Sequence, residues 1–195
     1  MTNVEREQEW TCAVRSEQLL DHSARVLGPA ESPGAAKALL VRAVDEPRAA
    51  PRTVDLVPVM SVQQWRHYEE QRIAVEAGFG VGESEARRMV RELRDRGARL
   101  GLRLYFAQDG QQVVGGVGSF RLPVPHQSYA RLQEVDVFPG WRGQGYGDGL
   151  LTAVLAMLSS GYVSTVVVGA DEDEWPLSWY RRRGFRDTVR VSLDL

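Results

Sequence analysis

The chain has 195 residues, of which 43% are hydrophobic and 26% are charged, and this ordinary globular composition excludes a globally disordered protein. The net charge of −2 gives no basic field, so we expect no nucleic-acid partner. A single cysteine, Cys12, excludes an intrachain disulfide and favours a reducing compartment. The longest apolar run, 150–158, is far shorter than the roughly 20 residues that span a bilayer. We therefore expect a cytoplasmic protein that has no membrane partner.

Residues 1–52 differ from the rest of the chain, because Gly and Pro interrupt short segments that have little periodic pattern. Apolar residues at 35, 39–41 and 44 favour a helix over about 34–44. Only one strand is predicted after Phe185, and the exposed edge of the sheet or an apolar face is where this segment would pack. We predict an appended segment, 1–52, that packs on the main domain, 53–195, or on its copy in a homodimer.

From residue 53 onward, ten elements are predicted in the order β-α-α-β-β-β-α-β-α-β. Their ranges, in chain order, are 54–59, 61–75, 83–100, 102–108, 112–122, 130–138, 144–160, 164–168, 176–183 and 185 onward. Strands come from β-branched and apolar runs, and helices from apolar residues spaced three and four apart. Because a strand–helix–strand crossover requires parallel neighbours, we predict a mixed sheet that is antiparallel in its first half and parallel across the helix 144–160.

Three local signals refine these elements. Ser61 and Gln64 form a capping box at the start of the first helix. Asp109-Gly110 is a turn signal that predicts a hairpin between the second and third strands. The arginine-rich face of the helix 83–100 is expected to be solvated and to form ion pairs such as Glu92 with Arg96.

The strand 130–138 continues through a glycine-rich turn into the helix 144–160. Such a turn directs several backbone N–H groups and the positive end of a helix dipole to one point, which suits a phosphate or a pyrophosphate. The dinucleotide fingerprint G-x-G-x-x-G is absent, because Asp148 and Leu150 stand where its last glycine is required. The only lysine, Lys37, lies outside any Gly-Lys-Ser/Thr loop, which excludes a nucleotide site of that type.

The turn instead matches the pattern R/Q-x-x-G-x-G/A through Arg142, Gly145 and Gly147. Val135-Asp-Val-x-Pro139 precedes it, and Tyr180-Arg-Arg-Arg-Gly-Phe follows near the C-terminus. In this order the motifs resemble those of the GNAT superfamily of acyl-CoA-dependent N-acyltransferases, and 170–185 resembles a bacterial subgroup. The resemblance covers about residues 53–195. It implies an α/β (α+β) fold with a mixed central β-sheet, helices on both faces and splayed parallel strands that hold acyl-CoA.

The resemblance also implies which residues bind acetyl-CoA, the expected cosubstrate. The backbone of Val135 and Val137 would pair with the amides of pantetheine. The pyrophosphate would lie against the backbone of Arg142, Gly143, Gln144, Gly145, Tyr146 and Gly147. Asp173 stands where the family often has an asparagine that contacts the cofactor, and this departure either weakens one contact with CoA or helps to attract a cationic amine.

Acyl transfer to an amine needs a neutral amine, donors for the oxyanion and a proton for the departing thiolate. Tyr180 stands where the family has the tyrosine that protonates the CoA sulfur, and the alternative is a tyrosine packed at a helix end. Arg131 stands where some members have a glutamate base, so Glu134 is the nearest carboxylate. A water relay without a dedicated base is equally compatible with the family. Strand alternation places Glu134 on the side of Asp136.

Metal catalysis is not expected, because the three histidines are isolated and no H-E-x-x-H motif or cysteine pair is present. We predict an enzyme, an acetyl-CoA-dependent N-acetyltransferase that acts by direct attack in a ternary complex. Its acceptor would be a primary amine of a small molecule or a peptide. The alternative is a non-catalytic acyl-CoA-binding regulatory module. Residues 61–100 are expected to supply the acceptor site, but they have no motif that names the acceptor.

Overall fold

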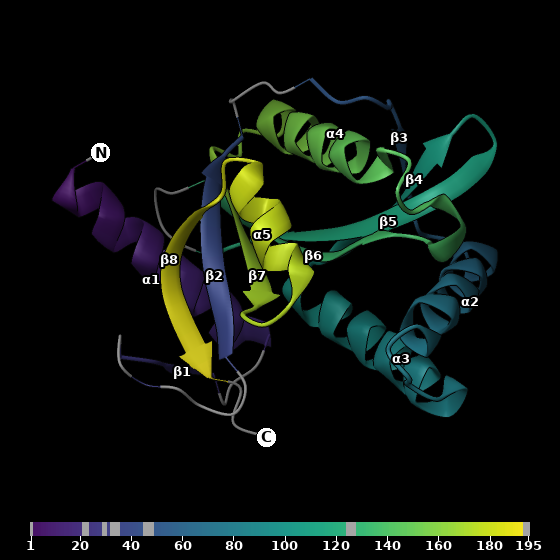
Figure 1. Cartoon of the computed structure of the whole chain (residues 1–195), viewed down its shortest axis with the longest axis horizontal. Helices are drawn as coiled ribbons and strands as arrows, with labels where there is room; N and C mark the ends of the chain where they lie inside the picture. Colours follow the sequence, from purple (N-terminus) through teal and green to yellow (C-terminus); the bar gives the residue numbers. More distant parts are fainter. Residues whose placement is uncertain are drawn as a thin grey trace. The chain divides into compact units, whose positions relative to one another are not determined.

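The computed structural model describes residues 2–20, 24–28, 31, 36–44, 49–123 and 128–192, which form two compact units. Unit 1 contains the described residues within 1–45, 121–131 and 158–195, and unit 2 those within 46–120 and 132–157. In chain order the elements labelled in Figure 1, with one short 3-10 helix, η1, are α1 (Asn3–Leu20), β1 (Arg25–Val26), β2 (Ala36–Ala43), β3 (Asp55–Pro58), α2 (Val62–Ala77), α3 (Glu83–Leu100), β4 (Arg103–Asp109), β5 (Gln112–Arg121), β6 (Tyr129–Val137), η1 (Pro139–Trp141), α4 (Tyr146–Ser160), β7 (Thr165–Asp171), α5 (Trp175–Arg182) and β8 (Arg186–Ser192).

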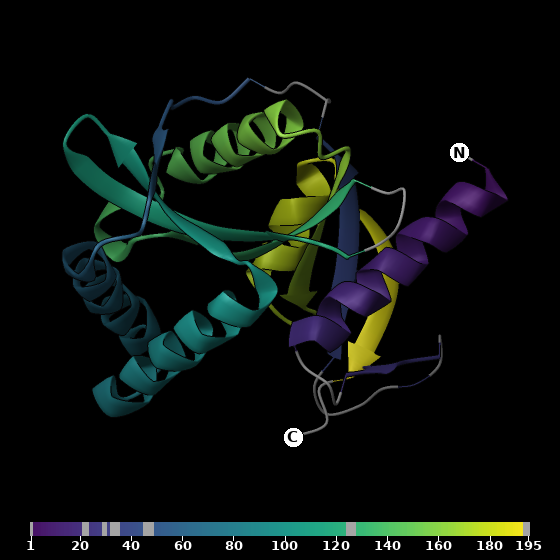
Figure 2. The same ribbon diagram turned by 180° about the vertical axis from the view of Figure 1, so that it is seen from behind.

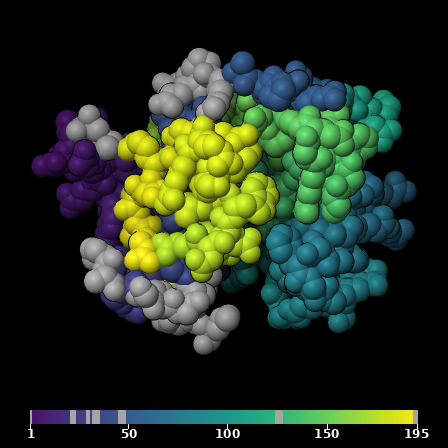
Figure 3. Space-filling view, viewed as in Figure 1, coloured from purple at the N-terminus to yellow at the C-terminus, as the bar shows by residue number. Residues whose placement is uncertain are grey.

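In unit 1 the strand order is β1-β8-β2-β7-β6. β2 pairs antiparallel with both β7 and β8, whereas β6 pairs with β7 in parallel from Tyr129↔Thr165 to Arg131↔Val167. α1 packs on β2, β7 and β8 from one face of these strands, and α5 covers the opposite face (Figures 1 and 2). The purple N-terminal helix and the yellow C-terminal strand therefore adjoin in the space-filling view (Figure 3).

The predicted helix over 34–44 is wrong, because Ala36–Ala43 forms the strand β2. The first two residues of the predicted range lie outside the described residues. Leu39, Leu40 and Val41 are all fully buried, so the strand is covered on both faces. Such a strand shows a continuous apolar run instead of alternation, and periodicity alone does not separate it from a buried helix. The division of the chain at residue 52 stays a prediction.

In unit 2 the strand order is β6-β5-β4-β3, and the β3–β4 and β4–β5 pairs are antiparallel. Asp109 faces Gln112 across the turn, which confirms the predicted hairpin. α4 lies on one face of this hairpin and α2 with α3 on the other (Figures 1 and 2). A buried core cluster holds the helices to the strands and consists of Val59, Tyr68, Val75, Val90, Leu93, Leu104, Phe106 and Phe138.

The order of elements from residue 53 is the predicted one, with η1 added before α4. The capping box is also confirmed, since Ser61 Oγ accepts from the Gln64 amide at 3.1 Å and Gln64 Oε1 accepts from the Ser61 amide at 2.8 Å. β6 belongs to both units, and the described strands form a mixed sheet of eight, which confirms the α/β fold class. Within the described part of the chain, no helix is long and apolar enough to cross a bilayer.

Candidate active site

The glycine turn joins β6 to α4 in unit 2. Gly143 and Gly145 have φ angles of 73° and 85°, in the left-handed region that favours glycine. Arg142 Nε donates to the Val137 carbonyl at 3.0 Å, and Gln144 Nε2 donates to the Gly140 carbonyl at 3.2 Å, so both side chains fold back and hold the turn. The first amides of α4 have no acceptor inside the helix, and these N–H groups can bind an anion.

Pro51 and Arg52 pack against this turn. A Cβ atom at Gly145 would lie 2.8 Å from Pro51 Cγ, so glycine is required there by contact as well as by its φ angle. Arg52 Nε donates to the Gln144 carbonyl at 3.4 Å, and its guanidinium lies 5.2 Å from the centroid of the Tyr146 ring. The Tyr146 hydroxyl donates to Asp109 Oδ2 at 2.7 Å. The Tyr146 side chain therefore has a packing role.

Gly143 offers a direct test of pyrophosphate binding, because a Cβ atom there would meet nothing within 4 Å. In Gly143→Ala the methyl group strains the backbone beside the turn amides. We expect the Kd of CoA, measured by calorimetry, to rise about ten- to hundredfold, which corresponds to one lost hydrogen bond to a charged group. Gly80→Ala is the matched control, since Gly80 has a φ of 79° and the same open surroundings. Unchanged CoA affinity in a folded Gly143→Ala protein would place the anion elsewhere.

A group of charged side chains joins α2 to β6 in unit 2. Arg72 binds Asp136 and Glu76, and its Nη1 lies 3.3 Å from Glu134 Oε2. The Tyr68 hydroxyl donates to the same Glu134 oxygen at 3.3 Å. Glu134 and Asp136 thus lie on one side of β6, as alternation predicts.

The backbone of Glu134 is unusual for a strand residue. Its φ of 52° lies in the left-handed region, which costs free energy for a residue other than glycine. Left-handed residues in strands occur at β-bulges, which change the direction of a side chain and are frequent beside active sites. The neighbouring strand β5 allows this path, because a Cβ atom at Gly115 would lie 2.4 Å from the Asp136 carbonyl oxygen.

The surroundings of Glu134 make its carboxylate basic. Burial raises its pKa, the Arg72 guanidinium offsets only part of this effect, and the Asp136 carboxylate adds to the increase. Burial and the Glu134 carboxylate also hold the pKa of Tyr68 well above its usual value, so the phenol stays protonated and remains a donor. A carboxylate with a raised pKa is a stronger base and is better suited to accept a proton.

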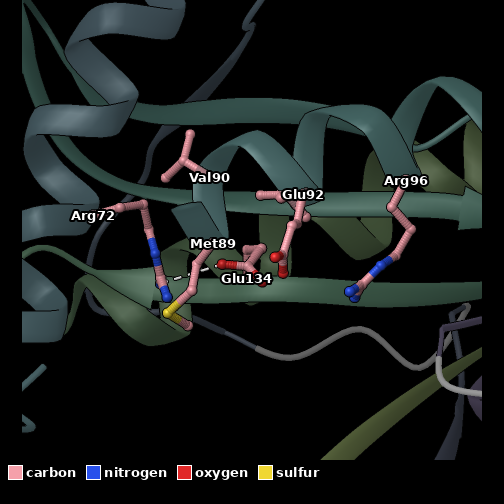
Figure 4. A pocket seen from close by; sticks show the side chains of 7 residues that line it. Arg72, Met89, Val90, Glu92, Arg96 and Glu134 are labelled. Carbon is pink, nitrogen blue, oxygen red and sulfur yellow. Dashed lines mark ion pairs between the residues drawn. The ribbon is translucent and has the colours of Figure 1, made fainter. Parts of the chain in front are cut away.

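Glu134 lines a pocket of about 130 Å³ whose walls come from α2, α3 and β6 (Figure 4). The lining residues are Arg72, Met89, Val90, Glu92, Leu93, Arg96 and Glu134. The predicted ion pair of Glu92 with Arg96 is wrong: Glu92 Oε1 accepts from Arg88 Nη1 at 2.7 Å. Arg96 forms no ion pair or hydrogen bond with any residue that the structure describes.

Residues 101–187 match the family model described as "Acetyltransferase (GNAT) domain". Over these residues the chain is similar to a GNAT acetyltransferase domain. No curated protein matches the chain.

Three solved structures share the fold of this matched range and its surroundings. A functionally unknown conserved protein from Staphylococcus epidermidis ATCC 12228 has 16% identity and a TM-score of 0.62, over 90% of this chain and 64% of its own length. A GCN5-related N-acetyltransferase from Ralstonia eutropha JMP134 has 21% identity and a TM-score of 0.55, over 73% of this chain and 98% of its own length. A predicted acetyltransferase with acetyl-CoA from Clostridium acetobutylicum has 15% identity and a TM-score of 0.50, over 70% of this chain and 92% of its own length. The chain thus spans less than two thirds of the first of these proteins.

The matched range extends into unit 1, where Tyr180 lies in α5 and is only 6% exposed. The centroid of its ring lies 4.9 Å from that of Trp179 and 5.1 Å from that of Phe185. Asp173 is exposed in the turn between β7 and α5, and its neighbour Glu172 forms an ion pair with Arg190. The assignment of Tyr180 as an acid and of Asp173 as a cofactor contact stays a prediction.

A buried ion pair also lies in unit 1. Arg131, the last residue of β6 in register with β7, places Nη2 at 2.7 Å from Glu17 Oε2 and Nη1 at 3.2 Å from Ser16 Oγ of α1. Lys37 of β2 donates to the other oxygen of Glu17 at 3.1 Å. A Cβ atom at Gly169 would lie 2.5 Å from Arg131 Nη2. The side chain of Arg131 lies within residues 101–187, which match the family model. It is therefore held in place by α1, which lies outside that range.

Sequence reasoning missed Arg72 and Arg96 as parts of the site. A signal for Arg72 exists, because positions 68, 72 and 75 share one face of α2, and a charged residue on a buried face needs partners. Arg96 has no such signal. Among the described residues no group of His, Cys, Asp and Glu is arranged to hold a metal ion, and His22 and His126 lie outside them.

Proposed function

We propose that the chain is an acetyl-CoA-dependent N-acetyltransferase that moves the acetyl group to a primary amine by direct attack in a ternary complex. The similarity to a GNAT domain supports acetyl transfer as the chemistry. One observation carries the choice of an enzyme over a non-catalytic acyl-CoA-binding module: Glu134, a carboxylate of raised pKa, lines a pocket in which an amine can lie.

In this proposal acetyl-CoA lies along β6 and the glycine turn. The amides of pantetheine pair with the backbone of Val135 and Val137, which lie beyond the three residues of β6 that are in register with β7. The pyrophosphate accepts hydrogen bonds from the backbone N–H groups of Gly143–Gly147, while Arg142 and Gln144 keep the turn in shape. Asp173 is proposed as a further contact of the cofactor.

The chemical step needs proton transfers at both reacting groups, the acceptor amine and the departing thiolate. Glu134 removes a proton from the ammonium group of the acceptor, directly or through one water molecule, and leaves a neutral amine. The amine nitrogen attacks the thioester carbonyl, and a backbone N–H near Val137 stabilises the oxyanion. When the C–S bond breaks, the hydroxyl of Tyr180 gives its proton to the thiolate of CoA. The proton that the new amide nitrogen loses restores Tyr180 through solvent.

Glu134→Gln tests this proposal, because an amide has the shape of the carboxylate but accepts no proton. We expect kcat for amine acetylation to fall about 10²–10⁴-fold, with no change in the calorimetric Kd of acetyl-CoA. Since the pKa of Glu134 is raised above 4.5, the wild-type kcat is expected to fall with decreasing pH already above pH 4.5. If Glu134→Gln kept both the wild-type kcat and its decrease at low pH, Glu134 would be ruled out as the base and the water relay would be favoured.

A further inference from the structure

We infer that the pocket between α2, α3 and β6 binds the head of an amino acid, with the amino group at Glu134 and the carboxylate at Arg96. The inference rests on the proposed function and names the class of its acceptor. That class is a small amine with a carboxylate close to the amino group, an α-amino acid being the simplest member.

Opposite charges occupy different places on the wall of this pocket. Figure 4 shows the side chains of Glu134, Glu92 and Arg96 following one another along it. The Arg88 guanidinium lies 2.7 Å from Glu92, so the Glu92 carboxylate already has a partner within the protein. At the other end of the pocket, Glu134 shares Arg72 with Glu76 and Asp136, so three carboxylates face one guanidinium and an ammonium group at Glu134 meets excess negative charge. An anion farther along the wall meets the guanidinium of Arg96.

The two arginines of the pocket differ in their partners. Arg72 is bound by Glu76 and Asp136 and lies 3.3 Å from Glu134, so its charge is already neutralised within the protein. Arg96 has no ion pair or hydrogen bond within the described part of the chain, although its side chain lines the pocket and is partly buried. A planar guanidinium matches the two oxygens of a carboxylate, so Arg96 is the anion-binding group of this pocket.

The size of the pocket sets the size of the group that it takes. A cavity of roughly 150 Å³ holds a benzene molecule, and this pocket has a volume of about 130 Å³. The amino group, the carboxylate and the first two carbons of an amino acid make up a group of similar size. Met89, Val90 and Leu93 supply an apolar wall for those carbons.

The test compares a set of L-amino acids with their carboxamides, which carry the same amine without the negative charge. For the wild type, we expect kcat/KM to be about ten- to hundredfold higher for the acids, which corresponds to one charge-assisted hydrogen-bonded pair. Arg96→Met should remove this preference by raising KM for the acids, and it should leave KM for acetyl-CoA and the rates with the amides unchanged. Arg91→Met, at an exposed position of α3 outside the pocket, should change neither.

Calorimetric titration of the amino acids into the wild type and Arg96→Met, in the presence of CoA, separates the inference from the proposed function. Binding that is lost in Arg96→Met would uphold the inference, even if no amine were acetylated and the proposed function failed. Equal kcat/KM for acids and amides would overturn the inference while upholding the proposed function. An amino-acid affinity that Arg96→Met leaves unchanged would overturn it as well.

Discussion

The Arg131→Met variant is expected to be about 3–5 kcal/mol less stable than the wild type, because it leaves a buried carboxylate without its main partner. Glu17 is 2% exposed, and among the described residues Lys37 alone would remain beside it, at 3.1 Å. Domains of this size unfold with about 5–15 kcal/mol, so the loss is a large share of the total. Equilibrium denaturation in urea measures it.

The double variant Glu17→Leu/Arg131→Met is the control for that result. Replacing both members of a buried ion pair by apolar residues of similar volume is often neutral, so most of the lost stability should return. If the single variant were as stable as the wild type, or the double variant as unstable as the single one, the buried ion pair would not have the proposed effect on stability.

The same ion pair gives an expected dependence of stability on pH. Burial acts to raise the pKa of Glu17, but the Arg131 guanidinium and the Lys37 ammonium outweigh it, and the pKa is lowered below 4.5. A carboxylate whose pKa is lowered by folding contributes stability above its unfolded pKa and loses it as the pH falls through the folded value. The difference in stability between the wild type and the double variant should therefore change below about pH 4.5 and be constant above it.

Tyr180→Phe is expected to lower kcat for amine acetylation about 10²–10⁴-fold, the usual effect of losing one positioned proton donor. The phenyl ring keeps the contacts with Trp179 and Phe185, so the variant should fold and the Kd of acetyl-CoA should stay near that of the wild type. Tyr162→Phe is the control, since Tyr162 is 87% exposed. If Tyr180→Phe turned over a verified acceptor at nearly the wild-type rate, Tyr180 would have only a packing role.

The elements from residue 53 onward could be predicted because their patterns are local. α3 has an apolar stripe at helical spacing, and the hairpin has its own turn signal at Asp109-Gly110. α1 gave no such signal, since its buried face consists of Cys12, Ala13, Ser16 and Glu17, two of them polar. Glu17 can be buried because it pairs with Arg131, which lies more than a hundred positions away in the sequence. No local pattern indicates such a contact.

In the candidate site, too, some features follow from a local sequence motif and others arise only in the folded chain. The motif through Arg142, Gly145 and Gly147 marks the glycine turn, and the structure adds Pro51 as a second reason for glycine at position 145. The setting of Glu134 depends instead on Arg72 and Tyr68 from α2 and on the left-handed backbone of the strand residue. These are properties of the folded chain, because they arise from side chains that are distant in sequence and from a departure from regular strand geometry.

The activity proposed for this chain is transfer of the acetyl group of acetyl-CoA to a primary amine. The decisive measurement incubates the wild type with acetyl-CoA and a panel of primary amines that includes amino acids and peptides, and follows CoA thiol release together with the acetylated product by mass spectrometry. We predict thiol release that requires an amine and equals the amount of N-acetylated product. Binding of acetyl-CoA without amine-dependent thiol release across the panel would contradict the claim and leave an acyl-CoA-binding module.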